Sequence, residues 1–162
     1  MGERVATQEE AAALASAVRL RIIRMTHHRA LTNKELAHQL GKDPATVLHH
    51  VRKLVATGFL QAQPPRVGNR GAREIPYLST GLSWRLTWGE EHPSVGEALL
   101  EAFLGEVADV GVDRVEQTRL VARADQQELM GRFQALLDEL ADRPADPDAE
   151  HVAIYLAVYP AD

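Results

Sequence analysis

The chain has 162 residues with 45% hydrophobic content, enough to bury the core of one domain, or of a small domain with an appended unit. It contains no cysteine, which excludes disulfides, thiolate nucleophiles and thiolate metal sites. No run approaches the roughly 18 consecutive apolar residues of a membrane span, so we expect a cytoplasmic protein without a membrane segment.

The net charge of −5 is unevenly distributed along the chain. Residues 1–90 carry 13 Lys and Arg against 7 Asp and Glu, a net +6, whereas residues 91–162 carry 5 against 16, a net −11. A basic half suits a polyanionic partner, which would repel the acidic half. Because the turn-forming stretch WGEEHPS at residues 88–94 coincides with the change of sign, we expect two domains, 1–88 and 94–162.

Three helical segments are predicted in the basic half. Apolar residues recur at steps of three or four over residues 11–25, as one helix or as two short ones. A second helix follows Thr32, whose hydroxyl forms a capping box with Glu35 three residues later. Asp43 and Pro44 together mark the start of a third helix, and a glycine ends each of the last two.

A hairpin is predicted directly after the third helix. The stretches FLQAQ at residues 59–63 and EIPYLS at residues 74–79 flank a turn-rich segment, PPRVGNRGAR, that contains three arginines. We expect two strands joined by a long basic tip. Pro76 predicts that the second strand lies at a sheet edge, because proline cannot donate a ladder hydrogen bond.

The acidic half predicts alternating helices and strands. Helices are expected over residues 95–110 and 125–140, where apolar residues keep helical spacing, and strands over residues 114–122 and 152–159. The last stretch, VAIYLAVY, is apolar throughout, as in a strand covered on both faces. The predicted fold is therefore α+β: a winged helix-turn-helix domain with a C-terminal helical or α/β extension for dimerisation.

This arrangement suits duplex DNA. A capped helix can present its N-terminal half to base edges in the major groove, while cations on a flexible hairpin reach the backbone or the minor groove. The predicted DNA-binding residues lie on the second helix, the third helix and the hairpin: Asn33, Lys34, Ala45, Thr46, His49, His50, Arg52, Lys53, Arg66, Asn69, Arg70 and Arg73.

Residues 14–60 resemble the winged helix-turn-helix of ArsR-type bacterial transcriptional regulators. The most specific parts are the phrases AVRLRIIRM, TNKELAHQLG and TVLHHVRKLVATGFL, the last resembling the family's recognition helix as it runs into the wing. The resemblance implies a homodimer on an inverted-repeat operator, with Thr46, His49, His50 and Arg52 nearest the DNA.

The chain departs from the metal-sensing members of that family. Their cysteine pair has no counterpart in TNKELAHQLG, and residues 95–110 contain no histidine for a C-terminal metal site. We therefore expect no metal and no cofactor. The chain looks closer to the metal-independent branch, which has a longer C-terminal region.

The adjacent His49 and His50 admit a metal site, a pair of DNA contacts, or one outward and one inward side chain. Neighbouring side chains on a helix point about 100° apart, which disfavours a shared metal. Spacing places His49 beside Thr46 and Arg52, and His50 beside the apolar stripe that contains Val51. Arg19, Arg21 and Arg24 remain open between phosphate contacts, a solvated face and ion pairs.

Residues 95–110 form a helix with a wide apolar face, which a winged domain of this size cannot cover. We therefore expect this face to form a dimer interface. Its members are Val95, Leu99, Phe103, Val107 and Val110. We expect a homodimeric, nucleoid-associated regulator of double-stranded DNA without enzymatic activity, with a small apolar effector left open. The alternative is a winged-helix module that binds protein and not DNA.

Overall fold

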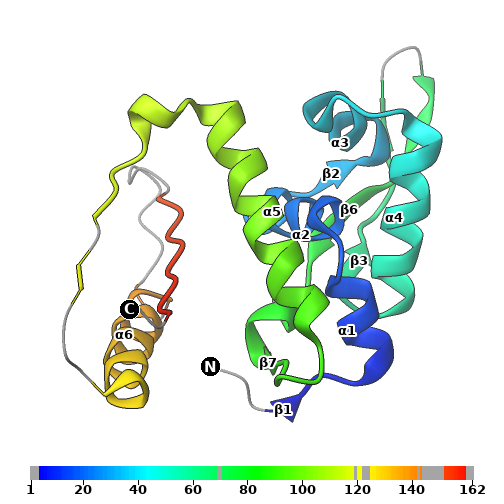
Figure 1. Ribbon diagram of the computed structural model, residues 1–162. Coiled ribbons are helices and arrows are strands. Elements are labelled where there is room, and N and C mark those ends of the chain that lie inside the picture. Colours follow the sequence, from blue (N-terminus) through cyan, green and yellow to red (C-terminus); the bar gives the residue numbers. More distant parts are fainter. Residues whose placement is uncertain are drawn as a thin grey trace. The chain divides into compact units, whose positions relative to one another are not determined.

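The computed structural model describes residues 4–68, 71–118, 120–121, 125–141, 143 and 152–159. The chain forms two compact units, residues 2–112 and residues 113–162, which are described separately (Figure 1).

Two short helices open the first unit. Helix α1 spans Gln8–Leu14 and helix α2 spans Ala17–Met25, so the second of the two sequence interpretations is correct. Thr7 and Glu10 form a capping box at the start of α1. Strand β1, Arg4–Val5, precedes α1 and pairs in parallel with β7, Leu86–Thr87.

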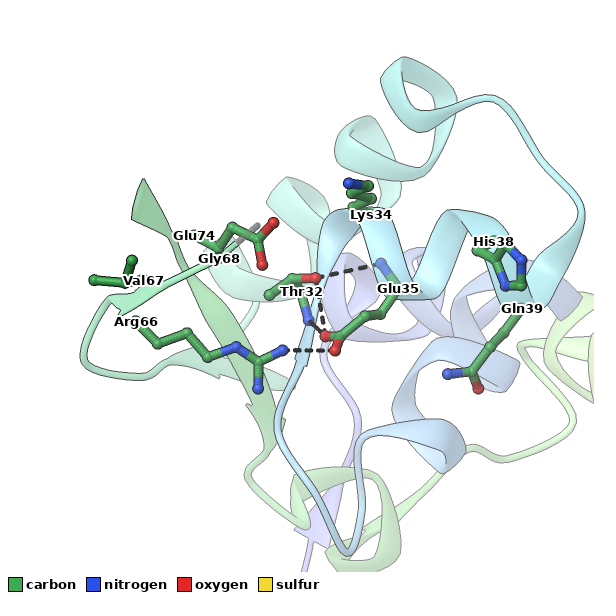
Figure 2. A pocket seen from close by; sticks show the side chains of 9 residues that line it. All are labelled: Thr32, Lys34, Glu35, His38, Gln39, Arg66, Val67, Gly68 and Glu74. Carbon is green, nitrogen blue, oxygen red and sulfur yellow. Dashed lines mark hydrogen bonds and ion pairs between the residues drawn. The ribbon is translucent and has the colours of Figure 1, made fainter. Parts of the chain in front are cut away.

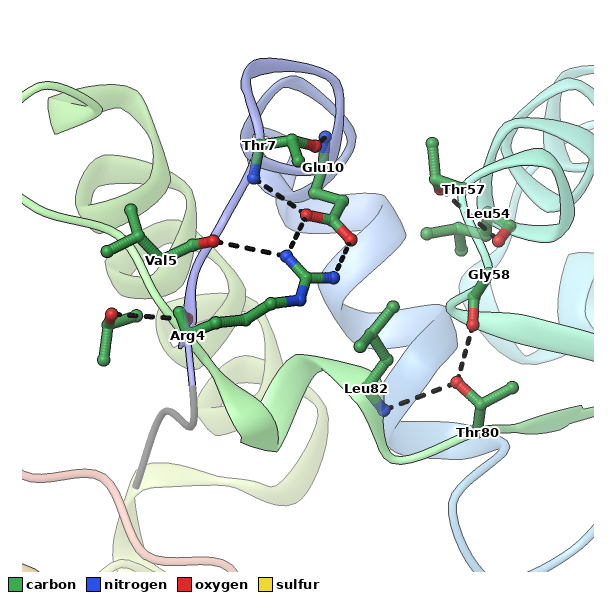
Figure 3. Close-up of polar contacts among 10 residues, drawn as sticks. Arg4, Val5, Thr7, Glu10, Leu54, Thr57, Gly58, Thr80 and Leu82 are labelled. Carbon is green, nitrogen blue, oxygen red and sulfur yellow. Dashed lines mark hydrogen bonds and ion pairs between the residues drawn. The ribbon is translucent and has the colours of Figure 1, made fainter.

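An ion pair fixes the N-terminal strand to α1 (Figure 3). Both terminal nitrogens of Arg4 donate to the Glu10 carboxylate, at 2.8 and 2.5 Å, and the backbone amide of Thr7 donates to the same carboxylate at 2.8 Å. These hydrogen bonds to Arg4 are the main reason why the pKa of Glu10 lies at about 2, against an ordinary value of 4.5. The carboxylate therefore stabilises the fold in its ionised form.

Helices α3, Asn33–Leu40, and α4, Pro44–Ala56, form the helix-turn-helix. The predicted capping box of Thr32 and Glu35 is present at the start of α3. Gly41 ends α3 with φ 59°, in the left-handed region that glycine occupies without strain. Local signals therefore define both ends of the turn between the helices.

The wing, the outer hairpin whose strands are residues 66–67 and 73–74, lies next to a three-stranded antiparallel sheet with the order β2-β6-β3. Its strands are β2, Leu31–Thr32, β3, Leu60–Ala62, and β6, Pro76–Ser79. Farther out, β4, Arg66–Val67, pairs with β5, Arg73–Glu74. The hairpin prediction is confirmed, but the edge position predicted for the second strand is wrong because β2 covers its other side.

Pro76 is compatible with this central strand because it is the first residue of β6, a position at which sheets tolerate proline. Its carbonyl still accepts a hydrogen bond from the amide of Gln63 at 2.8 Å.

One hydrophobic core joins the helices to the sheet. Among its fully buried side chains, seven large apolar ones come from α1, α2, α3, α4 and the residue before β3: Leu14, Ile22, Leu36, Val47, Val51, Leu54 and Phe59. Burial of each such side chain contributes roughly 1.5–3 kcal/mol. Three of the seven lie on one face of α4, so this packing fixes which face of α4 is left to solvent.

Helix α5, Pro93–Val110, packs against α2 and α1 inside the same unit (Figure 1). Turn η2, Leu82–Arg85, and strand β7 lead into it. The stretch at residues 88–94, where the sequence predicts a boundary, therefore lies within one compact unit. The break between units follows Val112.

The second unit contains helix α6, Gln126–Ala141, after the short turn η3, Val112–Arg114, at the junction of the units. Residues 115–118, 120–121 and 152–159 form neither helix nor strand, so the strands predicted over the described parts of 114–122 and over 152–159 are wrong. Each stretch has strand-like composition, but no partner strand pairs with it among the described residues.

Candidate nucleic-acid interface

The start of α4 is fixed by Asp43 and leaves the following residues exposed. One carboxylate oxygen of Asp43 accepts from the backbone amides of Ala45, at 2.8 Å, and Thr46, at 3.2 Å. Ala45 and Thr46 are exposed, as are His49 and Arg52 one and two turns later. Four predicted DNA-binding residues thus share the face of α4 opposite the core.

His49 and His50 have different surroundings. His49 is exposed, whereas His50 is half-buried and one ring nitrogen lies 3.5 Å from a guanidinium nitrogen of Arg19. The two imidazole centroids are 5.9 Å apart with planes inclined at 67°. Burial lowers the pKa of His50, and the positive charges of Arg19, His49 and Lys42 lower it further. His50 is therefore a packing residue at the rim of the exposed face.

Arg19 has a structural role. Its guanidinium donates to the main-chain carbonyls of Ala12, at 2.9 Å, and Ala13, in the last turn of α1. Burial lowers the pKa of Arg19. The side chain thus satisfies carbonyls that the end of α1 leaves without helical partners.

Lys53 and Arg66 each have a carboxylate partner. The Lys53 ammonium lies 3.0 Å from the carboxylate of Glu9 on α1. Arg66 of β4 donates to the carboxylate of Glu35 on α3 at 2.6 Å (Figure 2). The sequence places both cations at the expected surface but gives no sign of these partners, which lie 44 and 31 residues away.

Glu35 uses its two oxygens for different partners. One oxygen accepts from the Thr32 amide at 2.7 Å and from the Thr32 hydroxyl at 2.9 Å, while the other accepts from Arg66 (Figure 2). The backbone hydrogen bond from Thr32 is the main cause that lowers the pKa of Glu35. The carboxylate therefore both caps α3 and contacts the wing. These residues, together with Lys34 and Glu74, line a hollow of about 500 Å³.

The other predicted DNA-binding residues differ in how exposed their side chains are. Lys34 and Arg73 are exposed, and Asn69 and Arg70 lie outside the described residues. Asn33 is half-buried and its amide donates to the carbonyl of Pro44 at 2.9 Å, which connects the starts of α3 and α4. Asn33 is therefore a structural residue of the helix-turn-helix in this conformation.

Arg21 and Arg24 form ion pairs between α2 and α5. Arg21 contacts Asp109, and Arg24 lies 2.8 Å from Glu106. Of the alternatives that the sequence leaves open for these two arginines, the ion pairs are therefore correct. No local pattern in the sequence identifies these partners, which lie 88 and 82 residues away.

The predicted dimer face on α5 divides into a buried and an exposed part. Val95 is fully buried in the core of its own chain. Leu99, Phe103 and Val107 are half-buried, and Val110 is 51% exposed. Two exposed side chains that the prediction omitted extend this surface: Leu100 and Leu104.

No group of three or more His, Cys, Asp and Glu side chains in the described part of the chain could hold a metal ion. Within the same residues, no helix is long and apolar enough to cross a membrane.

A family model described as "Helix-turn-helix domain" matches residues 14–61, from the end of α1 to the first residues of β3. This is less than a third of the chain. No curated protein matches the chain.

Several solved structures align with the chain at low identity. The adhesin competence repressor AdcR from Streptococcus pyogenes is 17% identical over 78% of this chain and 81% of its own, with a TM-score of 0.37. RV1404 from Mycobacterium tuberculosis is 17% identical over 84% of each chain, with a TM-score of 0.35. ZitR from Lactococcus lactis, in complex with DNA, is 19% identical over 78% of this chain and 75% of its own, with a TM-score of 0.36.

The family match and the chain's own geometry agree on the architecture. Helices α3 and α4 joined at Gly41, the sheet β2-β6-β3 and the outer hairpin β4-β5 occur in the order of a helix-turn-helix followed by a wing. The chain therefore has a mixed helix-and-sheet fold that contains a winged helix-turn-helix domain.

Proposed function

We propose that this protein is a sequence-specific DNA-binding transcriptional regulator of the ArsR type. The observation that carries the proposal is the exposed row of Thr46, His49 and Arg52 on the capped helix α4. A hydroxyl, an imidazole and a guanidinium can all hydrogen-bond to base edges or phosphates. The exposed Arg73 of β5 supplies a cation on the wing. Such a regulator acts in the cytoplasm, at the nucleoid.

The resemblance of residues 14–60 to ArsR-type regulators supports the family assignment, and the absence of cysteine favours its metal-independent branch. In functional terms, residues 1–88 bind DNA and residues 94–162 mediate dimerisation. No enzymatic activity is part of this proposal.

The regulator acts as a homodimer on an inverted-repeat operator. The exposed apolar side chains of α5 support this part of the proposal, in particular Leu104 at 56% exposure and Val110 at 51%. A two-fold dimer would present two copies of α4 to successive major grooves, about 34 Å apart along the duplex. Dimerisation would thus fix the spacing of the half-sites.

A small apolar effector would bind to the second unit. Leu129, Phe133 and Leu137 of α6 are only half-buried, and Ile154 is 60% exposed. These side chains supply apolar surface for a ligand. A thermal shift with an apolar compound, and none with zinc, tests this assignment; a shift with zinc alone contradicts it.

A winged-helix module that binds protein is the second candidate. The pairing of Lys53 and Arg66 with carboxylates favours it, because these pairs lower the free positive charge on the surface that would face DNA. Binding to duplex DNA distinguishes the two candidates.

A gel-shift assay on the DNA upstream of the protein's own gene tests the proposal. We expect the wild type to bind and the double variant Arg52→Ala/Arg73→Ala to lose binding while keeping its oligomeric state. Arg132→Ala is a control for each single variant, Arg52→Ala and Arg73→Ala, because Arg132 is exposed on α6 and its loss also removes one positive charge. Normal binding by the double variant contradicts the assigned face.

A further inference from the structure

Two cations on the proposed DNA-binding surface are neutralised by carboxylates of the same chain. Lys53 follows the exposed Arg52 on α4 and pairs with Glu9 at 3.0 Å. Arg66 lies at the base of the wing and pairs with Glu35 at 2.6 Å. In contrast, Arg52 and Arg73 are exposed and have no ion-pair partner among the described residues. The surface therefore carries free and compensated cations side by side.

The two carboxylates differ in how firmly they are held. Glu35 cannot swing away from Arg66 without breaking its hydrogen bonds to the amide and the hydroxyl of Thr32. Glu9 is 69% exposed and has Lys53 as its ion-pair partner. A phosphate can displace Glu9 easily, but it must approach Arg66 against a negative charge that the helix cap keeps in place.

Sequence-independent affinity for DNA comes from cations that neutralise phosphates and release condensed counterions. A cation that already has a carboxylate partner adds less to this term. Contacts to base edges are not weakened in the same way, because they depend on hydrogen bonds from residues such as Thr46 and Arg52. Compensation of the flanking cations therefore lowers binding to arbitrary DNA more than binding to a matching site.

We propose that Glu35, and to a smaller extent Glu9, are specificity-determining residues that restrain binding to arbitrary DNA by neutralising Arg66 and Lys53. This inference rests on the proposed DNA-binding function. It assigns to Glu35 a role beyond the helix cap. The same carboxylate that starts α3 also sets how much charge the wing offers to a phosphate.

Titration of a fluorescent random-sequence duplex, followed by anisotropy at several salt concentrations, tests the inference without knowledge of the operator. Glu35→Gln keeps a capping-box residue but removes the negative charge. We expect it to bind about two- to fivefold more tightly near 50 mM salt, the range that exposed ion pairs typically contribute. The slope of log K against log salt should steepen by about one. Glu9→Gln should have a smaller effect in the same direction.

The control variants separate this effect from a general change of charge. Glu91→Gln removes one negative charge from the exposed turn before α5 and should change affinity less than twofold. In an Arg66→Ala background, Glu35→Gln should no longer tighten binding. A thermal melt of each variant shows whether the fold is retained, and the comparison within the Arg66→Ala background holds even if stability falls.

Two results overturn the inference alone: a gain in Glu35→Gln no larger than that in Glu91→Gln, or an equal gain in the Arg66→Ala background. A third result, no binding to any duplex by the wild type and by Glu35→Gln at the lowest salt, overturns the proposed function and the inference together. The first two results leave DNA binding intact, so the failures are distinguishable.

Discussion

Replacement of Asp43 by alanine should destabilise the first unit through the loss of the α4 cap. The carboxylate accepts hydrogen bonds from two backbone amides, at 2.8 and 3.2 Å, which no helical carbonyl can satisfy. Loss of such a cap costs about 1 kcal/mol, and loss of an acidic group at a helix N-terminus adds roughly 0.3–1 kcal/mol. We therefore expect Asp43→Ala to lower the free energy of unfolding by about 1–2 kcal/mol.

Urea denaturation followed by circular dichroism measures this difference, and the melting temperature should fall by about 4 °C for each kcal/mol. Asp43→Asn is the matched control, because asparagine is an equally good N-cap but carries no charge. It should lose less than half as much stability. If Asp43→Ala is as stable as the wild type, or Asp43→Asn is equally destabilised, the capping argument is refuted.

Three further perturbations test the acid response, the core and the dimer face. Because Arg4 lowers the pKa of Glu10 to about 2, the stability that the ionised carboxylate contributes is complete above about pH 4.5 and is lost as pH falls toward 2. Denaturation between pH 5 and 2 should show a shallower fall for Arg4→Ala, and equal pH slopes contradict the assignment. Phe59→Ala should cost about 3–5 kcal/mol in urea denaturation, since Phe59 is fully buried; a loss below 1 kcal/mol contradicts its place in the core. If the proposed homodimer forms through α5, Leu104→Asp should convert it to a monomer in light scattering after size exclusion, because burial of each leucine contributes roughly 1.5–3 kcal/mol; a variant that stays dimeric places the interface elsewhere.

The helix-turn-helix could be predicted from sequence because its limits are set by local interactions. The capping box at Thr32 needs only Glu35 three residues away, and Gly41 ends α3 through its own backbone conformation. Asp43 likewise caps amides within three residues. Short-range hydrogen bonds of this kind leave a pattern in the sequence that does not depend on the rest of the fold.

Long-range partners left no such pattern. Strand β2 has two residues and pairs with β6 about 45 positions later, so no local pattern shows that Pro76 lies in a central strand. The partners of Lys53 and Arg66 lie 44 and 31 residues away in sequence. The surface position of these cations follows from helical and strand periodicity, but the carboxylates that neutralise them depend on tertiary packing.

In the acidic half, by contrast, a strong local pattern predicts a strand that the described residues do not form. The stretch at residues 152–159 has apolar and β-branched side chains, and these predicted a buried strand, yet Val152 is 79% exposed and no strand forms over the stretch. Strand propensity describes how a side chain fits a sheet and does not supply the neighbouring strand.

An NMR titration of the labelled protein with a duplex that it binds tests whether α4 and the wing face DNA, because it shows which backbone amides change environment on binding. We expect the largest chemical-shift changes at Ala45, Thr46, His49 and Arg52 of α4 and at Arg73 of the wing, with small changes over α6. Changes concentrated on α6 or on the exposed side of α5, with α4 unaffected, would contradict it.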